Sequence, residues 1–218
     1  MIEAVIFDVD GTLVDSVDRH AESWERAFAR FGKDIPFAKL RSQIGKGGDQ
    51  LMPVFLDAAE LKRFGADIEA ARGAIFKAES LHRVKGFPGC TALFEALRAR
   101  GLRIALASSS KAAELEVYKQ AAGVDGLTDV ETSSDDADRS KPHPDIFAAA
   151  LAKLDLPPGR AIVVGDTPYD AEAARKAGIA AIGVLCGGFP AEDMRAAGAT
   201  RIYRDPEDLL AHIDEWAA

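Results

Sequence analysis

The 218-residue sequence predicts an α/β protein, with a doubly wound parallel sheet and a helical segment inserted after the first strand. Three observations lead to this prediction. From residue 87 onward, β-branched apolar runs alternate with helical patterns, which is typical of a parallel sheet. Residues 15–86 contain helical patterns and no convincing strand pattern. With 48% hydrophobic residues, the chain can bury one core and still carry such an insertion.

The expected strands are short apolar runs bounded by polar residues or glycine. The clear candidates are 4–7, 103–107, 161–164 and 181–185, and the weaker ones are 128–131 and 200–203. Between these runs, hydrophobic residues recur three to four positions apart, around 93–97, 146–151 and 209–216. This order indicates helices that connect parallel strands and cover both faces of the sheet.

The helical insertion is expected to begin after the first strand and to end at a Pro-Gly turn. Its first helix is indicated by large side chains at helical spacing, at Ala21, Trp24, Phe28 and Phe31. A glycine-rich turn and two further helix candidates follow, and residues 87–89 (FPG) mark the return to the sheet. We therefore predict a core of residues 1–14 and 87–218 and a helical cap of residues 15–86.

Composition excludes several classes of partner. The net charge is -8 and the chain has no Lys/Arg tract, which argues against nucleic acids and anionic membranes. Cys90 and Cys186 are too few for a disulfide framework or a thiolate metal site. The first residues have no basic leader pattern, and the longest apolar stretch is too short to span a bilayer. We expect a cytoplasmic protein, a monomer or weak homodimer, that binds a small molecule.

The first predicted strand ends on two carboxylates, Asp8 and Asp10, which are followed by Gly11 and Thr12. Ligands of open parallel sheets lie just outside the carboxyl ends of the strands. Because strand side chains alternate, Asp8 and Asp10 share a face. Asp and Gly also end strands as ordinary turn formers, so this motif alone leaves a catalytic and a structural interpretation equally open.

Three later strand ends or adjoining loops also carry polar side chains, at Ser108, at Lys141, and at Asp166 with Asp170. Phosphoryl transfer requires a nucleophile, an acid/base group and cations that neutralise the nonbridging oxygens, and this set supplies each of them. Carboxylates that meet at one place repel one another unless a cation holds them. The set therefore predicts a Mg²⁺ site with oxygen ligands.

Two of these positions also have structural interpretations. Ser108 and Ser109 offer hydroxyl and amide groups to a phosphoryl oxygen, but Ser108 could also cap the helix expected at 112–121. Lys141 lies between prolines in a stiff loop and could serve as a fixed counter-charge or be an ordinary surface lysine.

Asp170 has a structural interpretation as well. Thr167 and Pro168 resemble a helix cap and a first helical residue, which places Asp170 at the third helical position. An acid at that position stabilises a helix N-terminus without any metal. Asp166, directly at a strand end, is therefore the firmer candidate for a metal ligand.

Taken in order, these motifs resemble those of the haloacid dehalogenase superfamily of phosphohydrolases. The closest branch has a helical cap after the first strand and includes phosphoglycolate phosphatases and beta-phosphoglucomutases. The matching residues are 8–12 (DVDGT), Ser108, 140–142 (SKP) and 165–170 (GDTPYD). The resemblance covers essentially the whole chain, and four motifs in the right order are specific where each alone is weak.

The resemblance implies that Asp8 attacks phosphorus and forms an aspartyl phosphate. Asp10 would protonate the leaving oxygen and then deprotonate the attacking water. The dehalogenases of the superfamily lack the second acid, so Asp10 favours phosphate over halide chemistry.

The resemblance also implies two sets of ligands. Mg²⁺ would be held by Asp8, the Asp10 backbone carbonyl, Asp166 and Asp170. The transferring phosphoryl group would be bound by Ser108, Ser109, Lys141 and the amides around Gly11 and Thr12.

Residues of the cap are candidates for substrate recognition. By the same resemblance, His20 and the glycine-rich turn would face the site, where Lys46 and Gly47 could contact an anionic substrate. His20 could equally be a structural residue at the junction of cap and core. Trp24 is expected in the interior of the cap because of its spacing with the aromatic residues that follow it.

The predicted function is a Mg²⁺-dependent phosphatase that hydrolyses a small phosphorylated metabolite, either phosphoglycolate or a sugar phosphate. One alternative is a sugar phosphomutase like beta-phosphoglucomutase, although Asp49 stands close to where the mutase carries an arginine. A remote alternative is a phosphoacceptor signalling domain, which shares clustered acids, a Ser/Thr and a lysine. Such domains have no insertion after the first strand. The present chain has one of about seventy residues, which is large enough to act as an active-site lid.

Overall fold

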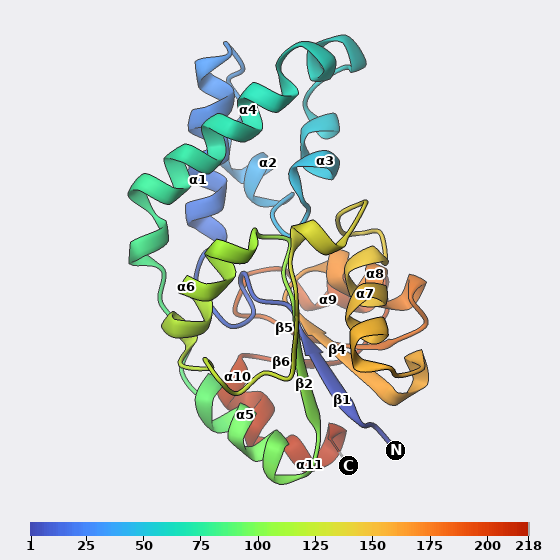
Figure 1. Ribbon diagram of the computed structural model, residues 1–218. Helices are drawn as coiled ribbons and strands as arrows, with labels where there is room; N and C mark the ends of the chain where they lie inside the picture. Colours follow the sequence, from blue (N-terminus) through green and yellow to red (C-terminus); the bar gives the residue numbers. More distant parts are fainter. Residues whose placement is uncertain (218) are drawn as a thin grey trace.

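The computed structural model describes residues 1–217 and contains a parallel sheet flanked by helices (Figure 1). Within these residues, six strands form the sheet in the order β3-β2-β1-β4-β5-β6, and each adjacent pair is parallel. The strands are β1 (Ala4–Phe7), β2 (Arg103–Ala107), β3 (Val130–Thr132), β4 (Ala161–Gly165), β5 (Ala180–Val184) and β6 (Ala199–Tyr203). The doubly wound sheet predicted from the sequence is confirmed, with β1 at the point where the strand order reverses.

The edge strand β3 begins two residues later than predicted. Val130 is the first residue in register, opposite Ala105. Immediately before it, the Asp129 carboxylate accepts a hydrogen bond of 2.8 Å from the Ile104 amide. This side chain replaces a backbone partner of β2, so regular pairing starts only at Val130. The other five strands lie within one residue of their predicted bounds.

Alternate residues of β1 face two apolar layers. Val5 and Phe7 belong to one layer, whereas Ala4 and Ile6 belong to the other. The first layer is covered by α5 (Cys90–Ala99), α6 (Ala112–Ala122), α10 (Pro206–Ala211) and α11 (Ile213–Trp216). The second layer is covered by α7 (Asp145–Leu154), α8 (Pro168–Lys176) and α9 (Ala191–Ala197). Because both faces are covered, β1 is apolar at every position.

Between β1 and α5, the described chain forms helices and no strand of the sheet. These helices are α1 (Val17–Arg30), α2 (Phe37–Arg41), α3 (Gly48–Leu51) and α4 (Ala58–Glu79). They lie beyond one end of the sheet, with α1 beside α4 (Figure 1). They enclose an apolar cluster of their own, which includes Trp24, Phe28, Leu40, Leu51 and Ile68. The expected position of Trp24 in this interior is confirmed.

Two chain segments connect the helical part to the sheet and run side by side. Val14 and Gly86 form an isolated antiparallel bridge. The Asp15 amide donates to the Lys85 carbonyl at 2.8 Å. This crossing lies where the sequence divides core from cap. We keep the name cap for residues 15–86, and the division itself stays a prediction.

The remaining short elements are 3-10 turns. They are η1 (Met52–Val54), η2 (Leu81–Arg83), η3 (Ser134–Asp136) and η4 (Pro158–Arg160). Within residues 1–217, no helix combines the length and the hydropathy needed to cross a membrane. Even α4, with 22 residues, carries charged side chains along its length.

Ser108 does not cap the helix that follows it, so this structural interpretation is wrong. Helix α6 begins at Ala112, and Lys111 occupies the cap position without a side-chain cap. The Ser108 hydroxyl instead accepts a hydrogen bond of 3.0 Å from the Ser110 amide. This bond closes a local turn directly after β2, which places both serines at the carboxyl edge of the sheet.

Gly73 lies in the middle of α4 and should weaken that helix, because glycine loses the most backbone entropy on folding. Among the described residues, nothing lies within 4 Å of a Cβ built at this position. We therefore expect Gly73→Ala to raise the free energy of unfolding by about 0.5–1 kcal/mol, as measured by urea denaturation.

Gly32→Ala is the matched control. A Cβ at Gly32 would also meet open space among the described residues, but the backbone there has φ +73°. We expect Gly32→Ala to lower the free energy of unfolding by about 1 kcal/mol, because this left-handed conformation strains an L-residue. A decrease for both variants would contradict the entropic explanation for Gly73.

Candidate functional site

The site lies at the carboxyl edge of the sheet, where β1 and β4 are adjacent. Asp8 follows β1, and its amide donates to the Val164 carbonyl of β4 at 2.8 Å. Asp166 follows β4, and Ser108 follows β2. The polar residues that the sequence places after separate strands are thus brought together at the reversal point of the strand order, as expected for this topology.

Lys141 reaches this edge from the loop before α7 and is only 1% exposed. Its Nζ lies 2.5 Å from Asp8 Oδ1 and 2.7 Å from Asp170 Oδ1. Burial alone would lower the pKa of Lys141, but the Asp170 and Asp8 carboxylates outweigh it and hold the pKa above its usual range. The interpretation of Lys141 as a surface lysine is therefore wrong, and the side chain is a buried, fixed positive charge.

Asp8 is buried between groups that have opposite effects on its pKa. Burial raises the pKa of Asp8, Lys141 opposes that change, and the Asp170 and Asp10 carboxylates add to it, so that the pKa lies above its usual range. The Thr12 hydroxyl donates to Asp8 Oδ2 at 3.0 Å. Additional positive charge at this position would favour the ionised form that a nucleophile requires.

Asp166 is completely buried, and only one of its oxygens is satisfied by a hydrogen bond. Thr12 donates to Oδ1 at 3.1 Å. Within residues 1–217, Oδ2 has no hydrogen-bond partner. Gly11 and Gly187 border Oδ2 so closely that a Cβ on either would overlap the carboxylate. Burial, Asp8 and Asp170 all raise the pKa of Asp166 well above its usual range.

These carboxylates fit a divalent cation. Asp8, Asp166 and Asp170 each offer one oxygen, and the three atoms lie within 4.8 Å of one another. Hard cations such as Mg²⁺ take oxygen ligands, and a cation would oppose both the burial and the repulsion that raise the pKa of Asp8 and Asp166. The unpartnered Oδ2 of Asp166 is the observation that most requires such a group.

Asp170 takes part in the helix cap that the sequence predicts, and it also lies in the acidic cluster. Its Oδ2 accepts hydrogen bonds from the Thr167 hydroxyl at 2.6 Å and from the Thr167 amide at 3.1 Å, while Thr167 caps α8 in return. Its Oδ1 faces Lys141. The capping box therefore fixes a carboxylate whose other oxygen remains directed at the site.

Asp10 lies on the cap side of the same edge and receives several hydrogen bonds. Ser16 donates to Oδ1 at 2.7 Å, His20 Nε2 lies 2.8 Å from the same oxygen, and Ser110 donates to Oδ2 at 2.9 Å. Burial raises the pKa of Asp10, but the charge of His20 and the bonds from these three residues outweigh it and lower the pKa to about 2. Asp10 is thus held ionised in this arrangement.

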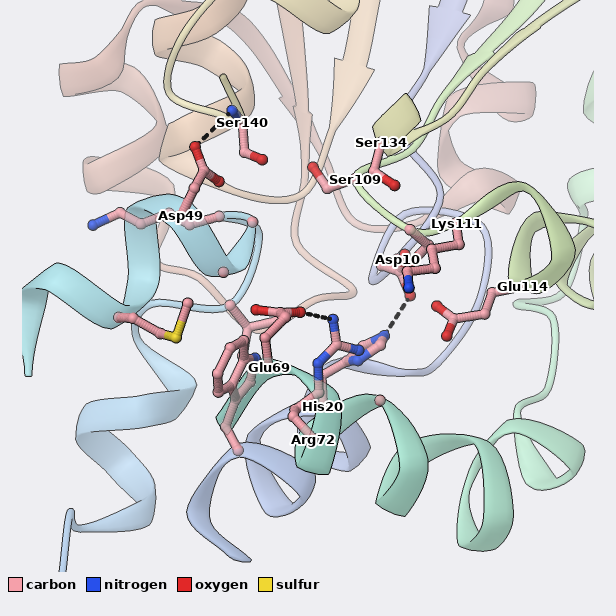
Figure 2. A pocket seen from close by; sticks show the side chains of 18 of the residues that line it. Asp10, His20, Asp49, Glu69, Arg72, Ser109, Lys111, Glu114, Ser134 and Ser140 are labelled. Atoms are coloured by element: carbon pink, nitrogen blue, oxygen red, sulfur yellow. Dashed lines mark hydrogen bonds and ion pairs between the residues drawn. The ribbon is translucent and has the colours of Figure 1, made fainter. Parts of the chain in front are cut away.

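His20 lies at the junction of cap and core, in contact with Asp10. Its ring stacks on Phe76 with centroids 4.0 Å apart, and Tyr118 Oη lies 3.3 Å from Nε2. The dashed line in Figure 2 marks its contact with Asp10. Its ring is therefore fixed by three neighbours and borders the cavity at the acid/base candidate.

The groups expected to bind phosphate differ in whether they are available for hydrogen bonds to a ligand. Ser109 lines the cavity next to Asp8 and Asp10. The Gly11 and Thr12 amides, in contrast, donate to the Val14 and Val9 carbonyls at 2.8 and 3.2 Å. These hydrogen bonds do not support the expectation that these two amides are available to a phosphoryl group. Gly11 is instead required by its φ of +82° and by its contact with Asp166.

A cavity of about 920 Å³ opens above the acids, between the sheet edge and the cap (Figure 2). Lys46 and Gly47 line it, as expected. Lys46 Nζ is also held by Gln43 at 2.6 Å and lies 4.6 Å from the centre of the Tyr169 ring. Lys46 therefore borders the cavity with its amino group directed toward these neighbours.

Five charged residues that line the cavity were not expected from the sequence, and two of them, Glu69 and Arg72 of α4, form a pair. The sequence pattern that could have identified this pair is a helix face of small residues that carries two charged residues three positions apart. The small residues that line the cavity around this pair are Gly65, Ala66, Ala70, Gly73 and Ala74. Such a face leaves room for a ligand where larger residues would fill the space.

Comparisons with known proteins agree with this geometry. The family model described as haloacid dehalogenase-like hydrolase matches residues 2–178. The chain is 27% identical over 219 residues to the phosphorylated carbohydrates phosphatase of Thermotoga maritima, covering 98% of this chain and 99% of that protein. It is 30% identical over 225 residues to the phosphoglycolate phosphatase of Rhodospirillum rubrum, covering 99% and 91%. The crystal structure of a hydrolase from Pseudomonas syringae superposes with a TM-score of 0.91 at 28% identity, over 100% of both chains.

Proposed function

The chain belongs to the haloacid dehalogenase-like hydrolases and is a phosphoric monoester hydrolase, and from this premise we propose that it is a Mg²⁺-dependent phosphatase of small phosphorylated metabolites. One observation carries the proposal. A buried lysine and three buried carboxylates meet at the reversal point of the sheet, with a further carboxylate beside them and a cavity above. This is the set of charges that phosphoryl transfer to a carboxylate requires.

Asp8 is the proposed nucleophile. Its carboxylate forms a bond to phosphorus while the bond between phosphorus and the leaving oxygen breaks, which yields an aspartyl phosphate and the free alcohol. Lys141 is in contact with Asp8 and neutralises negative charge on the transferring group. Water then attacks phosphorus, which releases inorganic phosphate and restores the Asp8 carboxylate.

Asp10 is the proposed acid and base. It donates a proton to the leaving oxygen in the first step and accepts one from the attacking water in the second. His20, with Nε2 2.8 Å from Asp10 Oδ1, fixes the position of this carboxylate. Because these hydrogen bonds hold Asp10 ionised, the first proton transfer requires that the bound substrate raise the pKa of Asp10, which the negative charge of its phosphoryl group would do.

The metal site is proposed at the acidic cluster. Asp8, Asp166 and Asp170, together with the Asp10 backbone carbonyl, would hold Mg²⁺. When bound, the ion supplies positive charge to the nonbridging oxygens of the phosphoryl group. Ser108 and Ser109, from the turn after β2, would bind the same phosphoryl group.

The cap is proposed to exclude water during the reaction. Hydrogen bonds join residues 41–49 of the cap to the core. Tyr169 of α8 donates to the Ser42 carbonyl at 2.7 Å, and the Ser140 amide donates to Asp49 at 3.1 Å. Arg41 donates to the Gly187 carbonyl at 3.0 Å. These contacts support a cap that lies over the cavity and limits the access of solvent.

Hydrolysis of a metabolite panel tests the function. With Mg²⁺, we expect the protein to release inorganic phosphate over many turnovers from phosphoglycolate or from a sugar phosphate, because water can attack the aspartyl phosphate. The measurement is phosphate release, with glucose 1-phosphate and glucose 6-phosphate also followed for interconversion. Interconversion without phosphate release would identify a mutase, and a single uptake of phosphate without turnover would identify a signalling domain.

The other expectations remain part of the proposal. They are a cytoplasmic location, a monomeric or weakly dimeric state, and the division into core and cap. Size-exclusion chromatography with light scattering would determine the second.

A further inference from the structure

We propose that Glu69 and Arg72 of α4 select the leaving group of the substrate, favouring an uncharged, hydroxylated group such as a sugar or polyol over a group that carries a carboxylate. The inference rests on the proposed phosphatase function and extends it to the substrate class. Both residues point from the cap into the cavity that holds Asp10 (Figure 2). Asp10 is the proposed donor of a proton to the leaving oxygen, so the leaving group lies in this cavity.

The Glu69–Arg72 pair is preorganised. Arg72 donates to Glu69 Oε1 at 3.2 Å, and its guanidinium lies 5.3 Å from the centre of the Trp24 ring. The side chain of Arg72 is only 16% exposed. The Glu69 carboxylate also lies against Gly48, where a Cβ would overlap it. The two charged groups are therefore held in place by the cap before any ligand binds.

The pair has unused hydrogen-bonding capacity in the wall of the cavity. Among the described residues, Glu69 Oε2 and Arg72 Nε are buried atoms without a hydrogen-bond partner. One is an acceptor and the other is a donor, and such buried atoms are costly to leave unpaired. A hydroxyl group is both donor and acceptor, so neighbouring hydroxyls of a sugar or polyol can satisfy both atoms.

The same arrangement disfavours an acidic leaving group. The charge of Arg72 is already balanced by Glu69, so a carboxylate that approaches Arg72 also approaches the negative charge of the Glu69 carboxylate. The side chain of Glu69 is 37% exposed, so water weakens this repulsion between like charges but does not change its sign. Lys46, Lys77 and Lys111 also line the cavity and are the contacts that an acidic group would use instead. A preference of the protein for such a substrate would assign recognition to these lysines.

The test compares four phosphate esters: sorbitol 6-phosphate, glucose 6-phosphate, phosphoglycolate and p-nitrophenyl phosphate. For the wild type, we expect a higher kcat/KM with at least one of the first two than with phosphoglycolate. Glu69→Ala should lower kcat/KM for the preferred hydroxylated ester about 10- to 100-fold, the effect of losing a hydrogen bond to a charged group. The same variant should raise kcat/KM for phosphoglycolate, because it removes the negative charge that balances Arg72. Its kcat/KM for p-nitrophenyl phosphate should change by less than about 3-fold.

Two further variants complete the test. Asp67→Ala removes an equal charge from an exposed position of α4 and should leave all four values unchanged. Glu69→Gln keeps an acceptor oxygen and the side-chain volume, so its kcat/KM for the hydroxylated ester should fall less than that of Glu69→Ala. Its kcat/KM for phosphoglycolate should still rise. This variant also tests the inference if Glu69→Ala folds poorly.

The results distinguish a failure of the leaving-group preference from a failure of the phosphatase function. A wild-type preference for phosphoglycolate, or an equal loss for all four esters in both Glu69 variants, would overturn the inference and leave the phosphatase function intact. Failure of the wild type to hydrolyse any of the four esters, p-nitrophenyl phosphate included, would overturn the proposed function and the inference with it.

Discussion

Asp8→Asn is expected to lower kcat for phosphate release by at least about four orders of magnitude, while the protein stays folded. An amide is a far weaker nucleophile than a carboxylate and cannot form the aspartyl phosphate. Folding should persist because the Asp8 side chain contacts Lys141 and Thr12 and does not pack in either apolar layer. Lys141 also keeps Asp170 as a partner at 2.7 Å. Phosphate release and thermal unfolding, measured on the same preparation, would check both expectations.

Asp15→Asn is the matched control for this variant. Asp15 is an exposed carboxylate close in sequence to Asp8, and the same chemical change there should leave kcat and the unfolding temperature unaltered. Normal turnover by Asp8→Asn would rule out the proposed nucleophile. Loss of activity together with loss of the folded state would instead show that the buried charge pair is required for folding.

Removal of divalent cations is expected to have the second-largest effect. In excess chelator, phosphate release should fall by more than about 100-fold and should return when Mg²⁺ is added in excess. The reason is the acidic cluster of Asp8, Asp166 and Asp170, in which Asp166 Oδ2 has no partner among the described residues. Without a bound cation, the negative charge of these carboxylates and of the phosphoryl group is opposed by the single positive charge of Lys141, which contacts Asp8 and Asp170.

A measurement independent of activity would support the same conclusion. Mg²⁺ at 100 times its dissociation constant should stabilise the folded wild type by about 2.7 kcal/mol, seen as a rise in the unfolding temperature. Asp166→Asn should abolish this rise, whereas Asp193→Asn, at an exposed position of α9, should preserve it. Full activity in excess chelator, or an equal stabilisation of Asp166→Asn by Mg²⁺, would contradict the metal assignment.

Much of the fold could be predicted because its signals are local. The β1 and β2 runs are apolar at nearly every position, which is the pattern of strands buried on both faces. The capping box of Thr167 and Asp170 spans only three residues and is visible in the sequence itself. The start of β3 was less predictable, because it depends on a hydrogen bond between the Asp129 side chain and a neighbouring strand.

The candidate acids could be predicted for a different reason. Strand order and handedness follow from the alternation of strands and helices, and ligands of such sheets lie at the carboxyl edge. Residues that follow a strand, such as Asp8 and Asp166, therefore belong to that edge wherever the rest of the chain lies. The four groups at strand ends and in adjoining loops were sufficient to indicate phosphoryl chemistry.

The sequence by itself determined the class of fold, the helical nature of residues 15–86 and the acids that follow the strands, because each depends on neighbouring residues and on the geometry of a parallel sheet. Only the tertiary structure decided that Lys141 is buried against Asp8, 133 positions earlier in the chain. It also decided that His20 contacts Asp10 and that Glu69 and Arg72 line the cavity. The Lys141 contact joins segments that are far apart in the chain, and the contacts of His20, Glu69 and Arg72 depend on how the cap packs over the sheet, which no local pattern encodes.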